Sequence, residues 1–146
     1  MKISGTVSGI LNQKGHQVYS ISAEATVFEA LQLMDEKNVG ALLVKSGDQL
    51  LGVMSERDYA RKVALKGKTS RETRVRDIIS SPPITAIPSD TVEDCMKRMT
   101  SNRVRHLPII EGDKLVGVVS IGDLVNWTIS AQDATIEQLE SYIRGL

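Results

Sequence analysis

Two aspartates occupy the same place in two copies of a short motif, Ser-x-x-Asp. The first copy runs from Ser55 to Asp58 and the second from Ser120 to Asp123. A carboxylate can accept two hydrogen bonds from the vicinal hydroxyls of a ribose, whereas it repels a phosphate. The same spacing is typical of a helix N-terminus, where a serine caps the helix and an acidic residue follows three positions later. The motif therefore indicates a sugar-binding carboxylate, a helix cap, or both.

Three basic residues are candidates for holding a phosphate. Arg57 precedes Asp58 at the expected start of a helix, where the helix dipole disfavours a cation. A bidentate contact with a phosphate would explain an arginine at that position. Arg105 and His106 form a second basic pair. The structural alternatives are a solvated surface for Arg105 and a hydrogen-bonded structural histidine for His106.

The sequence contains no recognisable catalytic or metal-binding constellation. Its two histidines and its single cysteine are scattered, without the spacing of a metal site. No nucleophile stands beside a base that could activate it. Cys95 falls on an apolar helical stripe, which predicts an inert buried thiol. We therefore expect a protein that is not an enzyme, holds no metal and requires no cofactor.

The two motifs belong to a longer internal repeat with an offset of 65 residues. Residues 18–59 align with residues 83–124 without a gap, and identical residues recur along the alignment. Such a repeat indicates that one supersecondary unit is built twice. Two copies favour a paired, pseudo-symmetric arrangement, since solenoids need more repeats.

The candidate phosphate ligands are not repeated. The counterpart of Arg57 is Gly122, and the counterpart of Arg105 is Gly40. Because an arginine in one copy aligns with a glycine in the other copy in both cases, we expect the two copies to bind a ligand with different affinities.

Each copy predicts a strand, a helix, two strands and a second helix, in that order. In the first copy, alternation at 18–21 indicates a short strand, and Thr26-x-x-Glu29 begins an amphipathic helix that ends before Gly40. Apolar residues at 41–44 and 50–54 flank a turn and predict a hairpin. A second helix is expected from the serine of each Ser-x-x-Asp motif, in the second copy to about residue 129.

The predicted fold class is α/β, more narrowly α+β, with two pseudo-symmetric βαββα units packed sheet against sheet. We predict an N-terminal segment at 1–17, a first unit at 18–66, a basic linker at 67–77, a second unit at 78–130 and a C-terminal helix at 131–146. The last helix carries Ile136, Leu139 and Ile143 on one face, which is typical of a packing or dimer helix.

Charge and composition argue against several functions. The formal net charge is zero and aromatic residues make up 3% of the chain, so neither global attraction to nucleic acid nor a base-stacking platform is implied. The stretch 57–76 is an exception, because it carries eight basic and two acidic residues. This stretch leaves open an alternative in which it binds nucleic acid or an acidic partner.

The sequence also bears on location. It has no apolar run long enough to span a membrane and no apolar signal-peptide core at its start. A single cysteine suits a reducing compartment. We therefore expect a cytoplasmic protein without a membrane partner.

The ordered set of motifs resembles the CBS domain, in the tandem pair called a Bateman module. The resemblance rests on Thr26-Val27 and Thr91-Val92 at the starts of the first helices, on the strand Arg105–Ile110 (Arg-His-Leu-Pro-Ile-Ile), and on the doubled turn Gly-h-x-Ser-x-x-Asp, in which h is apolar. It covers residues 12–130. The run Ser55–Lys62 looks like that of stand-alone bacterial CBS-pair proteins.

The resemblance implies a regulatory module rather than an enzyme. Such pairs bind an adenosine-containing small molecule, AMP, ADP, ATP or NAD and sometimes S-adenosylmethionine, in two clefts between the units. They signal by a ligand-linked conformational change and usually form homodimers, and a separate effector protein is a further expected partner. These ligands share adenosine and differ in the group that the basic residues must hold. The sequence does not distinguish among them.

The resemblance also implies roles for particular residues. In the family, the aspartate and serine of the motif hold the ribose, and basic residues near the cleft touch the phosphates. The adenine is expected beside the leading strand of each unit, where the hydroxyl of Thr85 could bond to ribose or phosphate. The candidate ligand-binding residues are therefore Ser55, Asp58, Ser120, Asp123, Arg57, Arg105, His106, Thr85, Tyr19, Ile21, Ile84 and Ile87.

Overall fold

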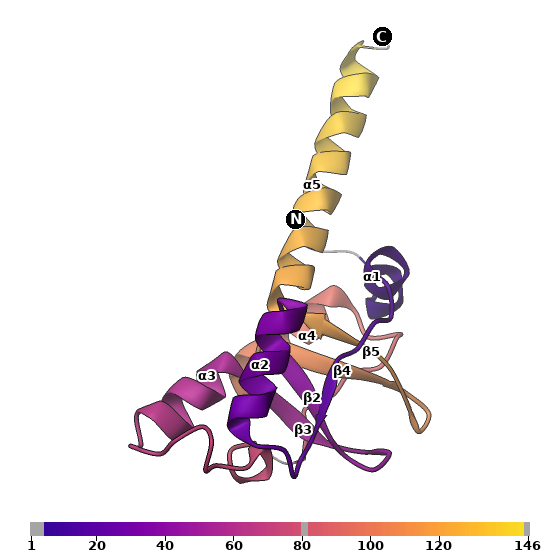
Figure 1. The fold of residues 1–146 in the computed structure, drawn as a ribbon. Helices are drawn as coiled ribbons and strands as arrows, with labels where there is room; N and C mark the ends of the chain where they lie inside the picture. The colour runs from indigo at the N-terminus through magenta and orange to yellow at the C-terminus, as the bar shows by residue number, and fades with distance from the viewer. Residues whose placement is uncertain (1–4, 80–81, 145–146) are drawn as a thin grey trace. The chain divides into compact units, whose positions relative to one another are not determined.

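The computed structural model describes residues 5–79 and 82–144, and for residues 132–139 and 141–144 it describes the backbone alone. The fold mixes helices and small sheets, as predicted, in two compact units (Figure 1). One unit comprises residues 17–84 and is called the 17–84 unit. The other combines residues 5–16 with residues 85–144 and is called the split unit.

The 17–84 unit is built on a three-stranded sheet. Strand β1 (Ser20–Ser22) pairs in parallel with β2 (Ala41–Ser46), which pairs in antiparallel fashion with β3 (Gln49–Ser55). Helix α2 (Val27–Lys37) makes the crossover between the two parallel strands. The apolar faces of α2, β2 and β3 meet in one buried cluster, which confirms the predicted helix and hairpin.

Local sequence explains where α2 begins and ends. The side chain of Thr26 accepts a hydrogen bond from the backbone N–H of Glu29 at 3.1 Å and so caps the first turn. Val27, Ala30 and Met34 follow at helical spacing and are buried. The helix stops at Asn38, which adopts a left-handed conformation with φ of 54° and donates its N–H to Met34.

The helix after β3 is irregular. Helix α3 (Glu56–Tyr59) has regular α geometry, and the next turn, η1 (Ala60–Ala64), is a π-helix in which the Leu65 N–H reaches the Ala60 carbonyl at 3.0 Å. A π-helical turn is wider than an α-helical turn and is often found at functional sites. It lies directly after the first Ser-x-x-Asp motif.

The split unit contains the hairpin of β4 (His106–Glu111) and β5 (Lys114–Ser120), flanked by α1 (Val7–Lys14), α4 (Val92–Asn102) and α5 (Ile121–Arg144). The second motif opens α5. The sequence predicted a helix to about residue 129 and another at 131–146, but the structure has one uninterrupted helix through Arg144. The intervening residues include neither proline nor glycine, so nothing there stops the helix.

The two units repeat the same register. In the 17–84 unit, Ile21 of β1 pairs in parallel with Val44 of β2. In the split unit, Ala86 forms a parallel bridge with Ile109 of β4. Each residue of the second pair lies 65 positions after its counterpart, so the gapless repeat in the sequence corresponds to an equivalent sheet position in the structure.

Residues 67–77, expected as a basic linker, pack within the 17–84 unit. The carbonyl of Thr73 accepts a hydrogen bond from the Val27 N–H at 2.8 Å, and the Val75 N–H donates to Ala25 at 2.9 Å. The 3-10 helix η2 (Val75–Asp77) follows, and the Val75 side chain is completely buried. Val75 belongs to the unit's apolar cluster, so this segment is part of the unit's core.

The N-terminal segment makes the same contacts with the split unit. The Val92 N–H donates to Gly5 at 3.1 Å, and the Val7 N–H donates to Asp90 at 2.9 Å. Val92 and Asp90 are the repeat counterparts of Val27 and Ala25, which form the equivalent hydrogen bonds with Thr73 and Val75 in the 17–84 unit. The N-terminal segment, which precedes the first repeat, therefore packs on the second repeat. The segment 67–77, which precedes the second repeat, packs on the first.

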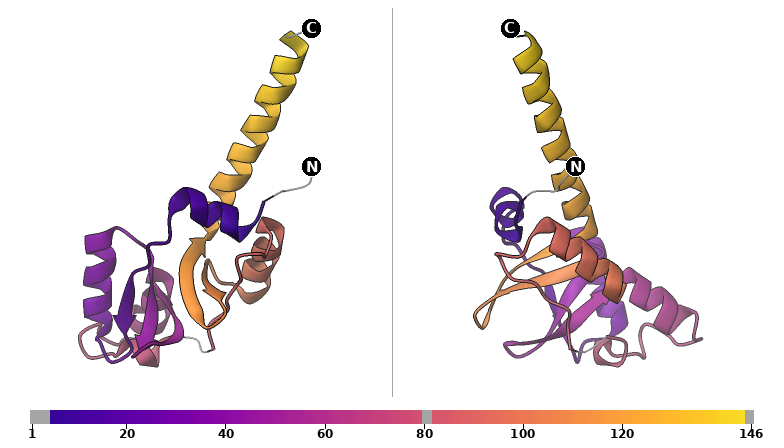
Figure 2. Two further views of the ribbon diagram at one scale, coloured as in Figure 1. Left: turned by 90° about the vertical axis from the view of Figure 1, so that its right-hand side faces the viewer. Right: turned by 180° about the vertical axis from the view of Figure 1, so that it is seen from behind.

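Close packing holds α1 on the split unit (Figure 2). Leu11 lies over Gly117 of β5, where a Cβ atom would approach a Leu11 methyl group to 2.8 Å. The ring of Trp127 lies against Gly9, where a Cβ atom would be 3.0 Å from the ring. Because both glycines permit approaches that a larger residue would block, α1 is seated in a defined position on β5 and α5.

Candidate functional site

The first Ser-x-x-Asp motif forms a complete capping box at the junction of β3 and α3. The Asp58 Oδ2 atom accepts hydrogen bonds from the Ser55 N–H at 2.9 Å and the Ser55 hydroxyl at 3.0 Å. In return, the Ser55 hydroxyl oxygen accepts a hydrogen bond from the Asp58 N–H at 3.3 Å. The structural interpretation of this motif is therefore confirmed.

A lysine pairs with the other oxygen of Asp58. The Lys62 Nζ atom lies 3.3 Å from Asp58 Oδ1, one helical turn further along the chain. The same ammonium group donates to the Ile78 carbonyl at 2.8 Å. Because Asp58 is held by its own cap and by Lys62, its carboxylate is fixed in direction while its side chain stays 26% exposed.

The second motif repeats the cap at the start of α5. Asp123 Oδ2 accepts a hydrogen bond from the Ser120 N–H at 2.8 Å, and the Ser120 hydroxyl oxygen accepts one from the Asp123 N–H at 3.1 Å. The two aspartates thus have equivalent backbone partners in the two units.

The lysine beside Asp123 comes from a distant part of the chain. Lys14 of α1 places its Nζ atom 2.7 Å from Asp123 Oδ2 and 2.9 Å from the Val118 carbonyl. Burial disfavours the charged form of Asp123, but hydrogen bonds from Lys14 and Ser120 and the charge of Lys14 outweigh it, so that the pKa of this carboxyl lies below its ordinary value. Asp123 is therefore ionised at neutral pH.

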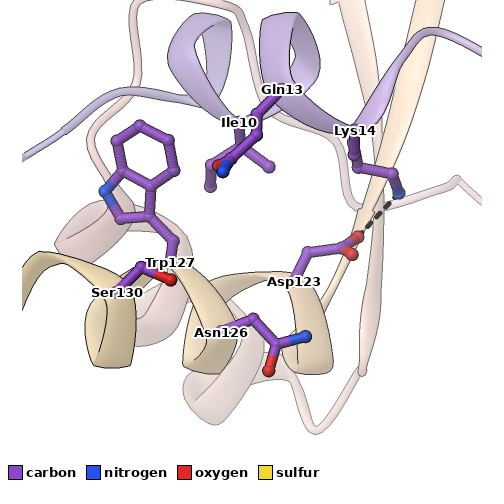
Figure 3. A pocket seen from close by; sticks show the side chains of 7 residues that line it. All are labelled: Ile10, Gln13, Lys14, Asp123, Asn126, Trp127 and Ser130. Carbon is purple, nitrogen blue, oxygen red and sulfur yellow. Dashed lines mark hydrogen bonds and ion pairs between the residues drawn. The ribbon is translucent and has the colours of Figure 1, made fainter. Parts of the chain in front are cut away.

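A pocket adjoins this ion pair between α1 and the beginning of α5 (Figure 3). Its volume is about 170 Å³. It combines one aromatic face, two side-chain amides and the ion pair, and its lining residues are Ile10, Gln13, Lys14, Asp123, Asn126, Trp127 and Ser130. Small-molecule sites are usually larger, about 300–1,000 Å³, and lined mainly by apolar side chains. This pocket has mostly polar walls, with Ile10 and Trp127 as its apolar side chains, and so could hold only part of a nucleotide.

The two carboxylates can therefore act as fixed hydrogen-bond acceptors. Each is held by a helix cap, so it would need little reorganisation to accept hydroxyl protons from a ligand. Each also has a lysine ammonium group within 3.3 Å. A ligand that carries hydroxyl groups and negative charge could therefore meet an acceptor and a cation at either position.

The predicted basic residues lie on or beside the elements that carry the motifs. Arg57 is partly buried in α3, beside Asp58. His106 begins β4 and pairs with Ser120 in the hairpin register, which brings it to the second motif. Arg105 is exposed, and its carbonyl accepts the Ile121 N–H at the start of α5.

Residues expected near adenine in the 17–84 unit lie at β1. The Tyr19 carbonyl accepts a hydrogen bond from the Leu43 N–H at 3.0 Å, and the Lys37 ammonium group lies 5.6 Å from the centre of the Tyr19 ring. Ile21 is partly buried and packs against the unit's core. Both residues therefore help to hold β1 to its own sheet, as a structural role requires.

Ile84, Thr85 and Ile87 lie at the boundary between the two units. Ile84 is the last residue of the 17–84 unit, and Thr85 and Ile87 belong to the split unit. The Thr85 carbonyl accepts a hydrogen bond from Arg98 at 3.1 Å, and Ile87 is 49% exposed. The ligand contacts expected at all three residues stay predictions.

Sequence reasoning missed the two lysines. Lys62 stands four residues after Asp58, a spacing that favours an ion pair on a helix and could have identified it. Its repeat counterpart is Trp127, so the second copy takes its ammonium group from α1 instead. Lys14 lies 109 residues before Asp123, and no local pattern connects them.

Several cations of the basic stretch 57–76 have local partners. Besides Lys62, the Arg71 guanidinium stacks 3.9 Å from the centre of the Phe28 ring. Arg74 donates to the Glu24 carbonyl, and Arg76 pairs with the Glu24 carboxylate. These contacts give the arginines structural roles within the 17–84 unit.

Two kinds of feature are absent from the part of the chain that the structure describes. No helix there combines the length and the apolar character that crossing a bilayer requires. Nor does any group of three or more histidine, cysteine, aspartate or glutamate side chains there lie close enough to hold a metal ion.

Comparison with known proteins places this geometry in a family. The profile of the CBS domain matches twice, over residues 7–65 and 75–130. The CBS domain-containing protein CBSX3, mitochondrial, of Arabidopsis thaliana is 37% identical over 97% of this chain and 73% of its own.

Solved structures give the same answer. A candidate signal-transduction protein with CBS domains from Burkholderia ambifaria MC40-6 is 44% identical, with a TM-score of 0.85 over 88% of this chain and 96% of its own. A hexameric CBS-CP12 protein from bloom-forming cyanobacteria is 28% identical, with a TM-score of 0.74 over 85% of this chain and 68% of its own. With two matched domains and two capped Ser-x-x-Asp motifs, the chain belongs to the CBS-domain family as a tandem pair.

Proposed function

We propose that this CBS pair is a regulatory module that binds an adenosine nucleotide at Asp58 and Asp123. The observation that carries the proposal is the doubled capped aspartate: each carboxylate is fixed by a capping serine and is about three-quarters buried. A carboxylate held in this way can accept both hydroxyl protons of a ribose. The resemblance of the relatives, one of them a candidate signal-transduction protein, supports a regulatory and non-catalytic role.

The neighbouring lysines are consistent with a charged nucleotide. Lys62 and Lys14 each bridge the motif aspartate and a backbone carbonyl. If a ribose hydroxyl donates a hydrogen bond to the carboxylate, the lysine ammonium group lies close to the sugar. From there it can approach the phosphate oxygens of the nucleotide. AMP, ADP, ATP and NAD all satisfy this chemistry. Arg57 and Arg105 supply further cations for the longer ligands, and the His106 ring can supply a hydrogen bond.

Ligand binding would act by changing the balance between two conformations. A nucleotide can shift such a balance only as far as its affinities for the two states differ. The readout would pass to a separate effector chain. We also propose that the protein forms homodimers. The hexameric CBS-CP12 relative supports self-association in general, without specifying a dimer.

Thermal unfolding with AMP, ADP, ATP, NAD and S-adenosylmethionine tests the proposal. A ligand at 100 times its Kd stabilises a protein by about 2.7 kcal/mol. For a chain of this length, that corresponds to a rise in Tm of about 5–10 °C. The 2′-deoxy form of the best ligand lacks the vicinal diol, and we expect it to lose most of this rise.

Variants make the test specific to the motif aspartates. Asp58→Asn with Asp123→Asn should abolish the rise. Asp94→Asn is the matched control, because Asp94 completes the capping box of α4 in the same way but lies outside both motifs. The proposal is wrong if no adenosine ligand raises Tm, or if the rise survives in the double variant.

A further inference from the structure

The exposed face of α5 is apolar at its beginning. Val125 is 44% exposed and Ile129 is 50% exposed, whereas Leu124 is fully buried and Trp127 lies against α1 on another face of the helix. Exposed valine and isoleucine one helical turn apart leave an unpartnered stripe. This stripe points away from the core of the split unit.

The helix continues well past the CBS domain. The family match ends at residue 130, whereas α5 runs without interruption to Arg144. Figures 1 and 2 show its second half extending beyond α1 and the β4–β5 hairpin of the same unit. The 20 residues from Val125 to Arg144 span about 30 Å.

The sequence carries a heptad pattern along this span. With Ile129 at position a, the later a positions are Ile136 and Ile143, and the d positions are Val125, Gln132 and Leu139. Isoleucine occupies all three a positions, and leucine occupies one of the three d positions. A β-branched residue at a with leucine at d favours a two-stranded parallel coiled coil. The stripe is continuous only because α5 is one helix, since a break near residue 131 would have separated its two halves.

Polar and charged residues also favour one arrangement. In a parallel pair in register, Gln132 meets Gln132 of the second copy, and the two amides can bond to each other. In a shifted or antiparallel pair, this amide would face an isoleucine or leucine and lose its partner. Asp133 and Glu140 occupy the e positions. Antiparallel helices would bring e positions of the two copies together and oppose like charges, whereas parallel helices place e beside the uncharged g position.

We infer that residues 125–144 of α5 form a parallel, in-register, two-stranded coiled coil with the same segment of a second copy of this chain. The inference specifies the surface for the self-association proposed above and does not depend on nucleotide binding. The coil would join two protomers through a helix that begins in the second CBS domain and extends past it, and it would leave both Ser-x-x-Asp motifs intact.

Disulfide trapping on the full chain tests the register. In the coiled coil, the Cα atoms of two d residues come within the range that a disulfide spans. We expect Leu139→Cys and Gln132→Cys, each made alone, to form covalent dimers on mild oxidation. Ser141→Cys is the matched control, since position f faces away from the partner. The native Cys95 is buried and gives no background.

Sedimentation equilibrium tests the energetics. Ile136→Lys puts a charge at position a and should raise the dimer Kd at least about tenfold. Gln138→Lys adds the same charge at position c and should leave the Kd nearly unchanged. A monomeric wild type would overturn both the proposed self-association and the coil. A dimer in which Ile136→Lys has no effect, or in which Ser141→Cys cross-links as well as Leu139→Cys, would overturn the coil alone.

Discussion

The ion pair between Lys14 and Asp123 ties the N-terminal helix to the second motif, and its strength can be worked from its geometry. The two atoms lie 2.7 Å apart, and the side chains are 32% and 23% exposed. Fully exposed pairs contribute about 0–1 kcal/mol, and hydrogen bonds to charged groups inside a protein about 1.5–3 kcal/mol. Partial exposure places this pair between these limits, near about 1 kcal/mol.

A double-mutant cycle measures this coupling. Lys14→Met keeps the apolar stem and removes the charge, and Asp123→Asn keeps the shape of the carboxyl. We expect Lys14→Met to lower the free energy of unfolding by about 1–2 kcal/mol in urea titrations, because the bond to Val118 is lost as well. The coupling between the two substitutions should be about 1 kcal/mol at pH 7.

The pH dependence gives an independent check. The pKa of Asp123 is lower in the folded protein than its ordinary value of 3.8. Its contribution to stability is therefore complete above that value and is lost as the pH falls through the lower pKa of the folded state. Lys14→Met removes the main interaction that lowers the folded-state pKa of Asp123, so the gap between its unfolded and folded pKa narrows. The loss of stability on acidification should therefore be smaller in this variant than in the wild type.

The first motif supplies the comparison. The Lys62–Asp58 pair is longer, at 3.3 Å, and Lys62 is 40% exposed on the same helix. Pairs of this kind contribute about 0.3–0.5 kcal/mol. The reasoning is refuted if the cycle of Lys62→Met with Asp58→Asn shows a coupling equal to or greater than that of Lys14 with Asp123, or if the Lys14 cycle is additive.

Three further predictions concern packing and reactivity. Gly117→Ala should lower the free energy of unfolding by about 1–3 kcal/mol in urea titrations, because the new methyl group would overlap Leu11; an unchanged midpoint would contradict the close approach. Burial raises the pKa of the Cys95 thiol to about 11, so the native protein at pH 8 should react with an aromatic disulfide reagent only at its rate of unfolding, and rapid labelling would show that the thiol is accessible. Arg71→Gln should cost about 0.5–1 kcal/mol of stability through loss of its stacking on Phe28, and a thermal melt identical to wild type would assign that contact no energy.

Most of the fold could be predicted from the internal repeat and the local patterns within each copy. Helices and hairpins in each copy followed from local periodicity, and the sheet register at Ile21 recurs 65 residues later at Ala86. The capping role of Ser55 and Ser120 was also readable, because a cap involves residues three positions apart. Features set by local spacing were therefore accessible from the sequence alone.

Features set by distant packing were not accessible. Lys14 reaches Asp123 because α1 docks on β5, a contact that no periodicity encodes. The leading segments also escaped the gapless alignment: Val7 corresponds to Val75 at an offset of 68 residues, three more than the rest of the repeat. The sequence analysis predicted two helices where the structure has the single helix α5, although the sequence near residue 130 has no signal that stops a helix.

The exchange of leading segments constrains how such a chain can be cut. A fragment that ends at residue 65 would lack Val75, which fills the core around its own sheet, and would retain α1, whose binding surface lies in the missing half. Neither repeat is thus a self-sufficient folding unit. Each half therefore depends on a segment that leads the other half, so a split protein should regain both cores only when its two fragments are present together.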